Sequence, residues 1–212
     1  MELQKEIENY ITLYTTEEDE VLRELDRETH LKVMGARMIS GHLQGQVLTM
    51  LSKMIRPHRI LELGTFTGYS AICLARGLQP GGKLITIEID DELEEITRRF
   101  FAKAGLTDKI IRKTGSALEI IPTLEESFDL VFIDADKREY VAYFQAIFPK
   151  VKNGGFIIAD NTLWSGKVIE KPVRGDEQTQ GIIRFNTWIK NDARVEQVIL
   201  PLRDGMTVVY KK

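Results

Sequence analysis

Paired cysteines, long apolar runs and an excess of basic charge are all missing from this sequence. Its one cysteine, Cys73, excludes an intramolecular disulfide and fits a reducing compartment. No apolar run approaches the roughly 20 residues that a helix needs to cross a bilayer. The first residues are acidic and amphipathic and lack the basic-then-apolar plan of a signal peptide. We therefore expect a cytoplasmic protein without a membrane partner.

The charge balance bears on the class of partner. With 29 basic and 32 acidic residues the net charge is −3, whereas a dedicated nucleic-acid binder usually carries a basic face or stripe. This balance disfavours a nucleic-acid partner without excluding one. The length of 212 residues, of which 43% are hydrophobic, suits one α/β domain with a substantial core.

The first third of the chain is predicted to be helical. Apolar or aromatic residues recur at helical spacing at positions 7, 10, 11 and 14, at 21, 22 and 25, and at 43, 47, 48 and 51. Pro57 ends this region. We therefore interpret residues 1–56 as the N-terminal helical part of a single domain that spans residues 1–212.

Strands and helices alternate after Pro57. Short apolar runs predict strands at 59–63, 83–88, 109–113, 128–134 and 155–160. Helices are expected from the turn at 64–68 to about Leu78, at 92–104 and at 139–148. Several strand runs are continuously apolar, which is typical of a parallel sheet that is buried on both faces.

The C-terminal part of the chain predicts a different arrangement. The β-rich runs 195–201 and 206–211 flank Asp204-Gly205, a hairpin signal, so an antiparallel pair is expected to complete a seven-stranded, mostly parallel sheet. The stretch 165–180 is polar and poor in apolar residues, and we interpret it as a mobile loop.

A cofactor is expected where the first predicted strand ends, because ligands of such sheets lie beyond the carboxyl ends of the strands. The turn from Gly64 to Gly68 misses the Gly-x-Gly-x-x-Gly dinucleotide fingerprint. Glu62 beside it suits a cationic ligand, and Glu88 ends the next strand at a distance that suits two ribose hydroxyls. Together they favour an adenosyl-amino-acid cofactor over a nicotinamide dinucleotide. An ordinary turn or a solvated carboxylate would explain each feature taken singly.

Oxygen ligands follow two other predicted strands. Asp134 ends one strand, and Asp160 and Asn161 end the next. If these strands are neighbours, they lie about 4.8 Å apart and the three side chains can converge. Two carboxylates and an amide oxygen make a hard site that suits Mg²⁺. The alternative is that the aspartates cap the helices that follow.

Lys137 lies three residues beyond Asp134 and is expected at the same edge of the sheet. A bound cation and a sulfonium nearby would favour its neutral amine, which can accept a proton. A lone lysine after a strand is more often a solvated surface residue, so this assignment depends on the neighbouring acids. Trp164 is a candidate wall for an aromatic acceptor, with simple packing as the alternative.

At these residues the sequence resembles the cation-dependent O-methyltransferases, the family of catechol O-methyltransferase and caffeoyl-CoA O-methyltransferase. The resemblance covers most of the chain and rests on Met38 with Gly45-Gln46, followed by ELGTFTGYSA, ITIEID, FIDADKREY, ADNTLW and LPLRDGMTV. It implies a Rossmann-like class I methyltransferase fold in which the N-terminal helical part shapes the acceptor site. It also implies a homodimer.

The resemblance further implies the reaction: transfer of a methyl group from S-adenosylmethionine to one hydroxyl of a catechol, caffeoyl or flavonoid-like phenol. The divalent cation is Mg²⁺, or Mn²⁺ or Ca²⁺ in its place. The implied cofactor residues are Ser40, Glu62, Gly64, Ser70, Glu88, Ser116, Ala117, Asp134 and Asp136. The implied metal ligands are Asp134, Asp160 and Asn161, with Lys137 as the base and Met38, Trp164 and Lys137 on the acceptor side.

Two points about the acceptor stay open at the level of sequence. Plant members of the family often carry acidic residues just before the Gly-Gln pair, where this chain has residues 40–44, Ser-Gly-His-Leu-Gln. Some bacterial relatives use the same apparatus to methylate a hydroxylated uridine in tRNA. The acidic balance of this chain disfavours that alternative, and salt-sensitive binding to tRNA would support it.

Overall fold

One mixed sheet forms the centre of the molecule. The computed structural model describes residues 2–171 and 173–212, with only the main chain for residues 2–5. Within them, seven strands pair in the order β3-β2-β1-β4-β5-β7-β6. The strands are β1 (Arg59–Leu63), β2 (Lys83–Glu88), β3 (Ile110–Thr114), β4 (Phe128–Ile133), β5 (Val151–Asp160), β6 (Val195–Leu200) and β7 (Met206–Lys211). Strand β7 runs antiparallel to β5 and β6, and the other pairs are parallel. The predicted sheet and hairpin are confirmed.

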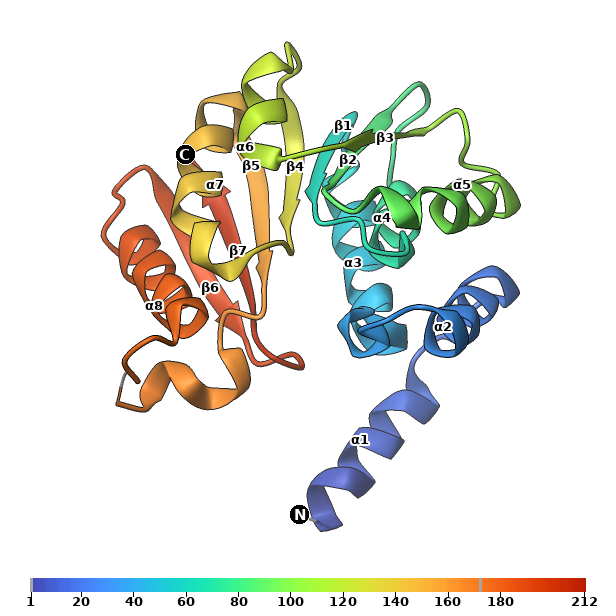
Figure 1. The fold of residues 1–212 in the computed structure, drawn as a ribbon, viewed down its shortest axis with the longest axis horizontal. Coiled ribbons are helices and arrows are strands. Elements are labelled where there is room, and N and C mark those ends of the chain that lie inside the picture. Colours follow the sequence, from blue (N-terminus) through green and yellow to red (C-terminus); the bar gives the residue numbers. More distant parts are fainter. Residues whose placement is uncertain (1, 172) are drawn as a thin grey trace.

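Helices cover both faces of this sheet (Figure 1). The α-helices are α1 (Glu2–Tyr14), α2 (Glu20–Lys32), α3 (Gly41–Ile55), α4 (Tyr69–Ala75), α5 (Glu94–Lys103), α6 (Ala117–Ile120), α7 (Tyr140–Ile147) and α8 (Glu177–Lys190). Three short 3₁₀ turns border the cavity described below: η1 (Ala36–Met38), η4 (Lys137–Glu139) and η6 (Trp164–Ile169). Helices α2 to α5 lie on one side of the sheet, and α6 to α8 lie on the other.

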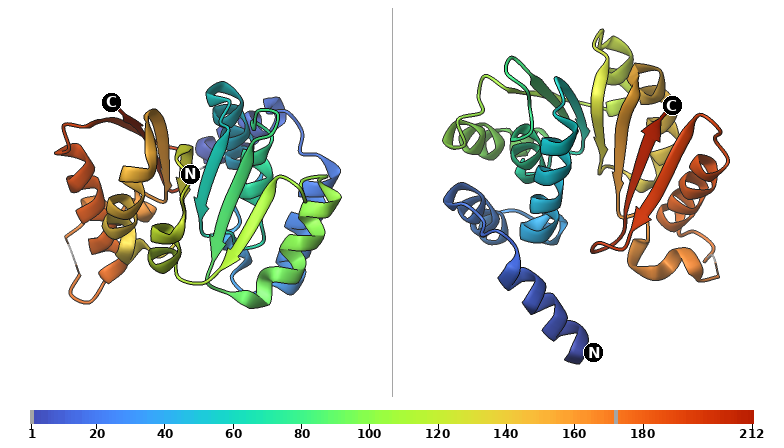
Figure 2. Two further views of the ribbon diagram at one scale, coloured as in Figure 1. Left: turned by 90° about the horizontal axis from the view of Figure 1, so that it is seen from above. Right: turned by 180° about the vertical axis from the view of Figure 1, so that it is seen from behind.

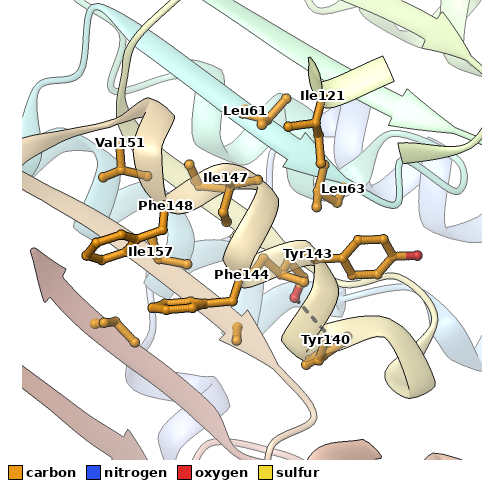
Figure 3. Packing of buried hydrophobic residues seen from close by; sticks show 14 of the residues in the cluster. Leu61, Leu63, Ile121, Tyr140, Tyr143, Phe144, Ile147, Phe148, Val151 and Ile157 are labelled. Atoms are coloured by element: carbon orange, nitrogen blue, oxygen red, sulfur yellow. Dashed lines mark hydrogen bonds between the residues drawn. The ribbon is translucent and has the colours of Figure 1, made fainter. Parts of the chain in front are cut away.

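Alternation along each strand explains why both faces are covered. Ile60 of β1 packs with α3, α4 and α5, whereas its neighbour Leu61 packs with α7 and α8. Both side chains are fully buried. Figure 3 shows the second layer, in which Phe144 and Ile147 of α7 meet the strand residues. Because successive side chains of a strand point to opposite faces, a continuously apolar run needs a helix layer on each side.

The order in which the chain adds strands to the sheet reverses between β1 and β4. Strand β1 pairs with β2 on one side and with β4 on the other, so the turns that follow β1 and β4 meet at one edge. Gly64 begins the first of these turns with φ +91°, and a Cβ atom there would lie 2.0 Å from the carbonyl oxygen of Asp134. Only glycine allows this close approach. Such a switch point is where α/β sheets bind ligands.

Two predicted segments differ from the structure. The expectation of a loop over 165–180 is wrong at both ends, because η6 includes residues up to Ile169 and α8 begins at Glu177. The first turn of α8 is polar and its buried Ile182 and Phe185 come later, which hides the helical period. Strand β5 begins at Val151 and not at 155, with a register shift against β4 that accommodates the glycines.

None of the helices within the described ranges is both long and apolar enough to cross a membrane. The location of the protein in the cell stays a prediction.

Candidate active site

A large cavity opens at the carboxyl ends of β1, β2, β4 and β5. Its volume is about 2260 Å³, well above the 300–1,000 Å³ or so of a site for one small ligand, so a cofactor and an acceptor fit side by side. Every predicted site residue except Glu62 lines it: Met38, Ser40, Gly64, Ser70, Glu88, Ser116, Ala117, Asp134, Asp136, Lys137, Asp160, Asn161 and Trp164. The structure therefore brings together residues from distant parts of the chain.

The carboxylate of Glu88 is fixed by the main chain at the carboxyl end of β2, where it lines the cavity. Its Oε2 accepts a hydrogen bond of 2.7 Å from the Phe66 amide, and its Oε1 accepts from the amides of Ile89 and Asp90 at 2.9 and 3.1 Å. These bonds tie the end of β2 to the glycine turn after β1. A carboxylate held in this way retains lone pairs that can accept hydrogen bonds from a pair of hydroxyls.

Glu62 lies behind the cavity wall and is fully buried. Its Oε1 accepts a hydrogen bond of 2.7 Å from Ser70 Oγ, and its Oε2 accepts one of 2.5 Å from Thr86 Oγ1. Burial raises the pKa of Glu62 from 4.5 to about 8. Ser70 lines the cavity and Glu62 does not, so Glu62 reaches the site through the hydroxyl that it orients. Its direct contact with a cofactor stays a prediction.

The two aspartates predicted as metal ligands lie at the carboxyl ends of neighbouring strands, in register with each other. Ile133 of β4 pairs with Ala159 of β5, so Asp134 and Asp160 come directly after paired residues. The buried hydroxyl of Tyr140 donates to the carbonyl oxygens of Ile133 and Asp160 at 3.3 and 3.1 Å. This tyrosine on α7 fixes the ends of the two strands against each other.

Asp160 is unusual because it is a nearly buried carboxylate, 3% exposed, beside a second carboxylate. Burial, followed by the negative charge of Asp134, raises the pKa of Asp160 to about 6. Both effects disfavour the charged form, and a cation would offset both. The donor set of two carboxylates and the adjacent amide of Asn161 is the oxygen chemistry that Mg²⁺, Mn²⁺ and Ca²⁺ prefer. The residues at this edge of the sheet therefore fit a divalent cation.

Asn161 has a main-chain conformation that side chains rarely adopt. Its φ is 56°, in the left-handed region, where asparagine is tolerated better than most residues. The main-chain amide of Asn161 donates a hydrogen bond to Asp160 Oδ1 at 2.8 Å. Within 2–171 and 173–212 no three His, Cys, Asp or Glu side chains gather as a metal centre. Asn161 as a third oxygen ligand beside Asp134 and Asp160 stays a prediction.

Lys137 is held at the mouth of the cavity and is 8% exposed. Its Nζ donates a hydrogen bond of 2.7 Å to Asp134 Oδ1. The same atom lies 5.3 Å from the centre of the Tyr140 ring and 6.0 Å from that of Trp164. This lysine is therefore a nearly buried group between a carboxylate and two aromatic rings, and not a solvated surface residue.

Segments that lie far apart in the sequence line another part of the cavity. Met38 of η1 lines it and is 58% exposed. Trp164 and Ser165 have positive φ values of 47° and 52° at the start of η6. The Ser165 amide donates to the Asp204 carboxylate, and the Trp164 amide donates to the Asp204 carbonyl at 3.3 Å. The hairpin turn thus holds the Trp164 segment in place.

Two polar residues that the sequence analysis did not select also belong to this region. Gln44 is 1% exposed and its Nε2 donates to Asp160 Oδ2 at 2.7 Å. Arg203 lines the cavity and donates to Gln44 Oε1 at 2.9 Å. A signal was present for the first: Gln44 lies four and eight residues before Leu48 and Ser52 on the buried face of α3. Arg203 lies in the segment LPLRDGMTV that carries the resemblance, but no feature of that segment assigned this arginine a role.

The chain is similar to known proteins over most of its length. Residues 12–212 match the model of a family described as O-methyltransferase. A catechol O-methyltransferase from Niastella koreensis is 34% identical, over 97% of this chain and 96% of that protein. A caffeoyl-CoA O-methyltransferase from Eucalyptus globulus is 37% identical, over 90% of this chain and 81% of that protein.

A solved structure shares the whole fold. The O-methyltransferase TomG from Streptomyces achromogenes, crystallised in complex with S-adenosylmethionine (SAM), superposes with a TM-score of 0.92 at 30% sequence identity. The match covers 100% of this chain and 99% of that chain.

Proposed function

The chain belongs to the O-methyltransferase family, and from this premise we propose that it transfers a methyl group from SAM to one hydroxyl of a vicinal dihydroxy aromatic molecule. A catechol, a caffeoyl compound or a flavonoid-like phenol offers such a pair of hydroxyls. The observation that carries the proposal is the group formed by Asp134, Asp160 and Asn161, with Lys137 beside it, at the mouth of the cavity.

The cofactor would bind along the turn after β1. Glu88 would accept hydrogen bonds from the two ribose hydroxyls, because the amides around it already fix its carboxylate. Ser70, oriented by Glu62, would contact the amino-acid part. Ser40, Gly64, Ser116, Ala117, Asp134 and Asp136 complete the proposed contacts, and all of them line the cavity.

The metal ligands would be Asp134, Asp160 and Asn161. When bound, SAM would supply the methyl group on a sulfonium, and a divalent cation would lower the pKa of the reacting hydroxyl. The protein contributes the buried Asp160 carboxylate and the nearby Asp134 carboxylate, whose repulsion a cation would relieve. Tyr140 keeps their strands in register.

Lys137 would take the proton from the reacting hydroxyl. Its Nζ already lies at the mouth of the cavity, 2.7 Å from Asp134 Oδ1, and its side chain is nearly buried. A base in this position contributes by removing one proton while the walls of the cavity orient the oxygen. Trp164 and Met38 would form those walls. The N-terminal part would thereby shape the acceptor site within one domain, since its residues 32–35 and 37–40 line the cavity.

A homodimer belongs to the same proposal. Helix α1 extends away from the rest of the chain (Figures 1 and 2). Ile7, Tyr10, Ile11 and Tyr14 repeat along one side of it, and they are 40% to 71% exposed. A helix of 13 residues is marginal in water without a partner. A second copy of the chain would cover this apolar side.

The direct test is methyl transfer to a panel of vicinal diols and their single-hydroxyl analogues, measured with labelled SAM in Mg²⁺ and in EDTA. We expect transfer to the diols alone and only with Mg²⁺. Asp160→Ala should abolish turnover and leave SAM binding largely intact, whereas Asp108→Ala, an exposed aspartate that does not line the cavity, should change neither. Full turnover in EDTA would remove the cation from the proposal.

A further inference from the structure

A chain of hydrogen bonds runs from the hairpin turn between β6 and β7 to the Asp160 carboxylate. Arg203 Nη1 donates to Gln44 Oε1 at 2.9 Å, and Gln44 Nε2 donates to Asp160 Oδ2 at 2.7 Å. The three residues come from the turn after β6, from α3 and from the end of β5. Gln44 and Asp160 are 1% and 3% exposed, so water has little access to the bond between them.

The arginine determines which way the Gln44 amide faces. A guanidinium group only donates hydrogen bonds, so the atom of Gln44 that faces Arg203 has to be the carbonyl oxygen. The NH₂ group is then directed at Asp160, where a donor is needed by a buried carboxylate. Exchanging the two ends of the amide would place donor against donor at Arg203 and acceptor against acceptor at Asp160. Both contacts select the same orientation.

Arg203 is itself held by the main chain around it. Its Nη1 also donates to the carbonyl oxygens of Ile39, at 3.0 Å, and Ser40. Gly205, two residues on, has φ +86°, and a Cβ atom there would lie 2.6 Å from the amide nitrogen of Leu163. The turn is therefore packed against the segment that carries Asn161 and Trp164, and Arg203 starts from a fixed main chain.

Each oxygen of Asp160 has one donor from the protein. Oδ1 accepts from the Asn161 amide at 2.8 Å, and Oδ2 accepts from Gln44. Two donors at the two oxygens fix the rotation of the carboxylate about its Cβ–Cγ bond and leave further lone pairs on each oxygen. Without Gln44, one nearly buried oxygen loses its donor and this constraint on the rotation is lost.

We propose that Gln44, oriented by Arg203, is a positioning residue that fixes the Asp160 carboxylate for the divalent cation. The inference rests on the proposed function of this site, since it assigns a task to groups that do not touch the acceptor. Partners that orient a metal ligand typically change metal affinity by about 10- to 100-fold when they are removed. The pair acts on the affinity for the cation and not on the methyl transfer itself.

The test measures Mn²⁺ binding directly, by electron paramagnetic resonance of the free ion, on the full chain without an acceptor. Gln44→Met keeps the length of the side chain and removes its donor, and we expect Mn²⁺ to bind about 10- to 100-fold more weakly. Gln46→Met makes the same change two residues away on α3, at a side chain that does not line the cavity, and it should bind Mn²⁺ normally. Asp160→Asn should lose most Mn²⁺ binding.

Arg203→Met supplies a second variant in case Gln44→Met does not fold. Freed from the guanidinium, the Gln44 amide can turn away from Asp160, so Mn²⁺ should bind less tightly than to the unmodified protein and no less tightly than to Gln44→Met. The double variant should bind like Gln44→Met alone, because both substitutions break one path. Equal and additive losses would show that the two residues act separately and would overturn the relay.

A kinetic readout separates positioning from a general structural defect. Turnover by Gln44→Met should recover towards that of the unmodified protein as Mg²⁺ is raised, with SAM affinity unchanged. A loss of turnover that persists at saturating Mg²⁺ would contradict positioning. Normal Mn²⁺ binding by Gln44→Met would overturn this inference alone, whereas failure of the unmodified protein to bind Mn²⁺ would overturn the metal-dependent function with it.

Discussion

The Lys137 side chain contacts one carboxylate and lies near two aromatic rings. Asp134 Oδ1 accepts its hydrogen bond at 2.7 Å. The Tyr140 and Trp164 rings within 6.0 Å and its exposure of only 8% keep water away. A divalent cation on Asp134 would compete for the same carboxylate. Ligand binding would therefore release the amine from its partner, at the point where an acceptor hydroxyl has to lose a proton.

Replacing this lysine should leave binding intact and slow the chemical step. We expect Lys137→Met to lower kcat by about 10²- to 10⁴-fold, the usual contribution of a positioned base. The loss should become smaller as the pH rises, because the acceptor then ionises without help. Single-turnover transfer from labelled SAM across a pH series measures this, with the exposed Lys53→Met on α3 as control. An equal loss at every pH would contradict the role of base.

Glu62 offers a separate test of electrostatics, because it titrates differently in the folded and unfolded chain. Burial raises its pKa from 4.5 to about 8, against the opposing effect of hydrogen bonds from Thr86 and Ser70. Between these two pH values the folded protein keeps a proton that the unfolded chain has lost. The unfolded state then binds fewer protons, so stability decreases as the pH rises through this window.

The cofactor-free protein should therefore become less stable between about pH 5 and about pH 8, by up to roughly 4 kcal/mol from this one group. Glu62→Gln cannot titrate and should lose that part of the pH dependence. Urea unfolding at both pH values measures the free energy of each protein, with Glu119→Gln on the exposed side of α6 as a matched substitution. The same slope in Glu62→Gln as in the unmodified protein would exclude the buried proton.

The bounds of β1 and β2 could be predicted from the sequence, whereas helix α8 could not. The strands β1 and β2 begin and end where they were predicted, because both faces of a central strand are covered and every residue between the two ends of each strand is buried. Helix α8 was not predicted, since its polar first turn continues the preceding loop and its buried residues begin at Thr179. Local pattern therefore located the elements that are buried all round, and it missed one that is buried on a single side.

The candidate site shows the same limit more sharply. Asp134, Asp160 and Lys137 could be predicted because strand ends in a parallel sheet meet at one edge. Gln44 and Arg203 are joined by contacts between residues 159 positions apart in the chain. Such a pairing depends on how α3 and the hairpin turn pack on the finished sheet, and no local pattern carries that information.

The exposed apolar side of helix α1 leads to a prediction about the oligomeric state. Ile7 and Ile11 are one turn apart and are 51% and 40% exposed. Introducing charge through Ile7→Glu with Ile11→Glu should convert the expected homodimer into single chains, as measured by light scattering after size exclusion. Asn9→Glu adds one charge on the opposite side of the same helix and should leave the dimer intact. A single-chain mass for the unmodified protein would refute the proposed dimer.

The charges of the whole molecule suit small acceptors and a cationic cofactor. The net charge is −3, and most basic side chains that line the cavity are already engaged. Lys32 and Arg99 both pair with Glu28, Arg138 pairs with Asp136, and Lys167 pairs with Asp176. Each of these pairs would have to open before its cation could neutralise a phosphate. An RNA backbone would therefore contact a cavity rim where most basic side chains are already paired with carboxylates of the protein.

We therefore expect no binding of tRNA even at low salt, measured by the anisotropy of a labelled tRNA with an established RNA-binding protein run alongside. Methyl transfer to a catechol should change little between low and physiological salt, because a neutral phenol releases no condensed counterions when it binds. Binding to tRNA that weakens steeply as salt is added would indicate several phosphate contacts and would reverse this expectation. Transfer of labelled methyl to a 5-hydroxyuridine in that tRNA would then reassign the acceptor from a small phenol to RNA. The roles proposed for Asp134, Asp160 and Lys137 would stay the same, because the reacting group would again be a hydroxyl beside a second oxygen.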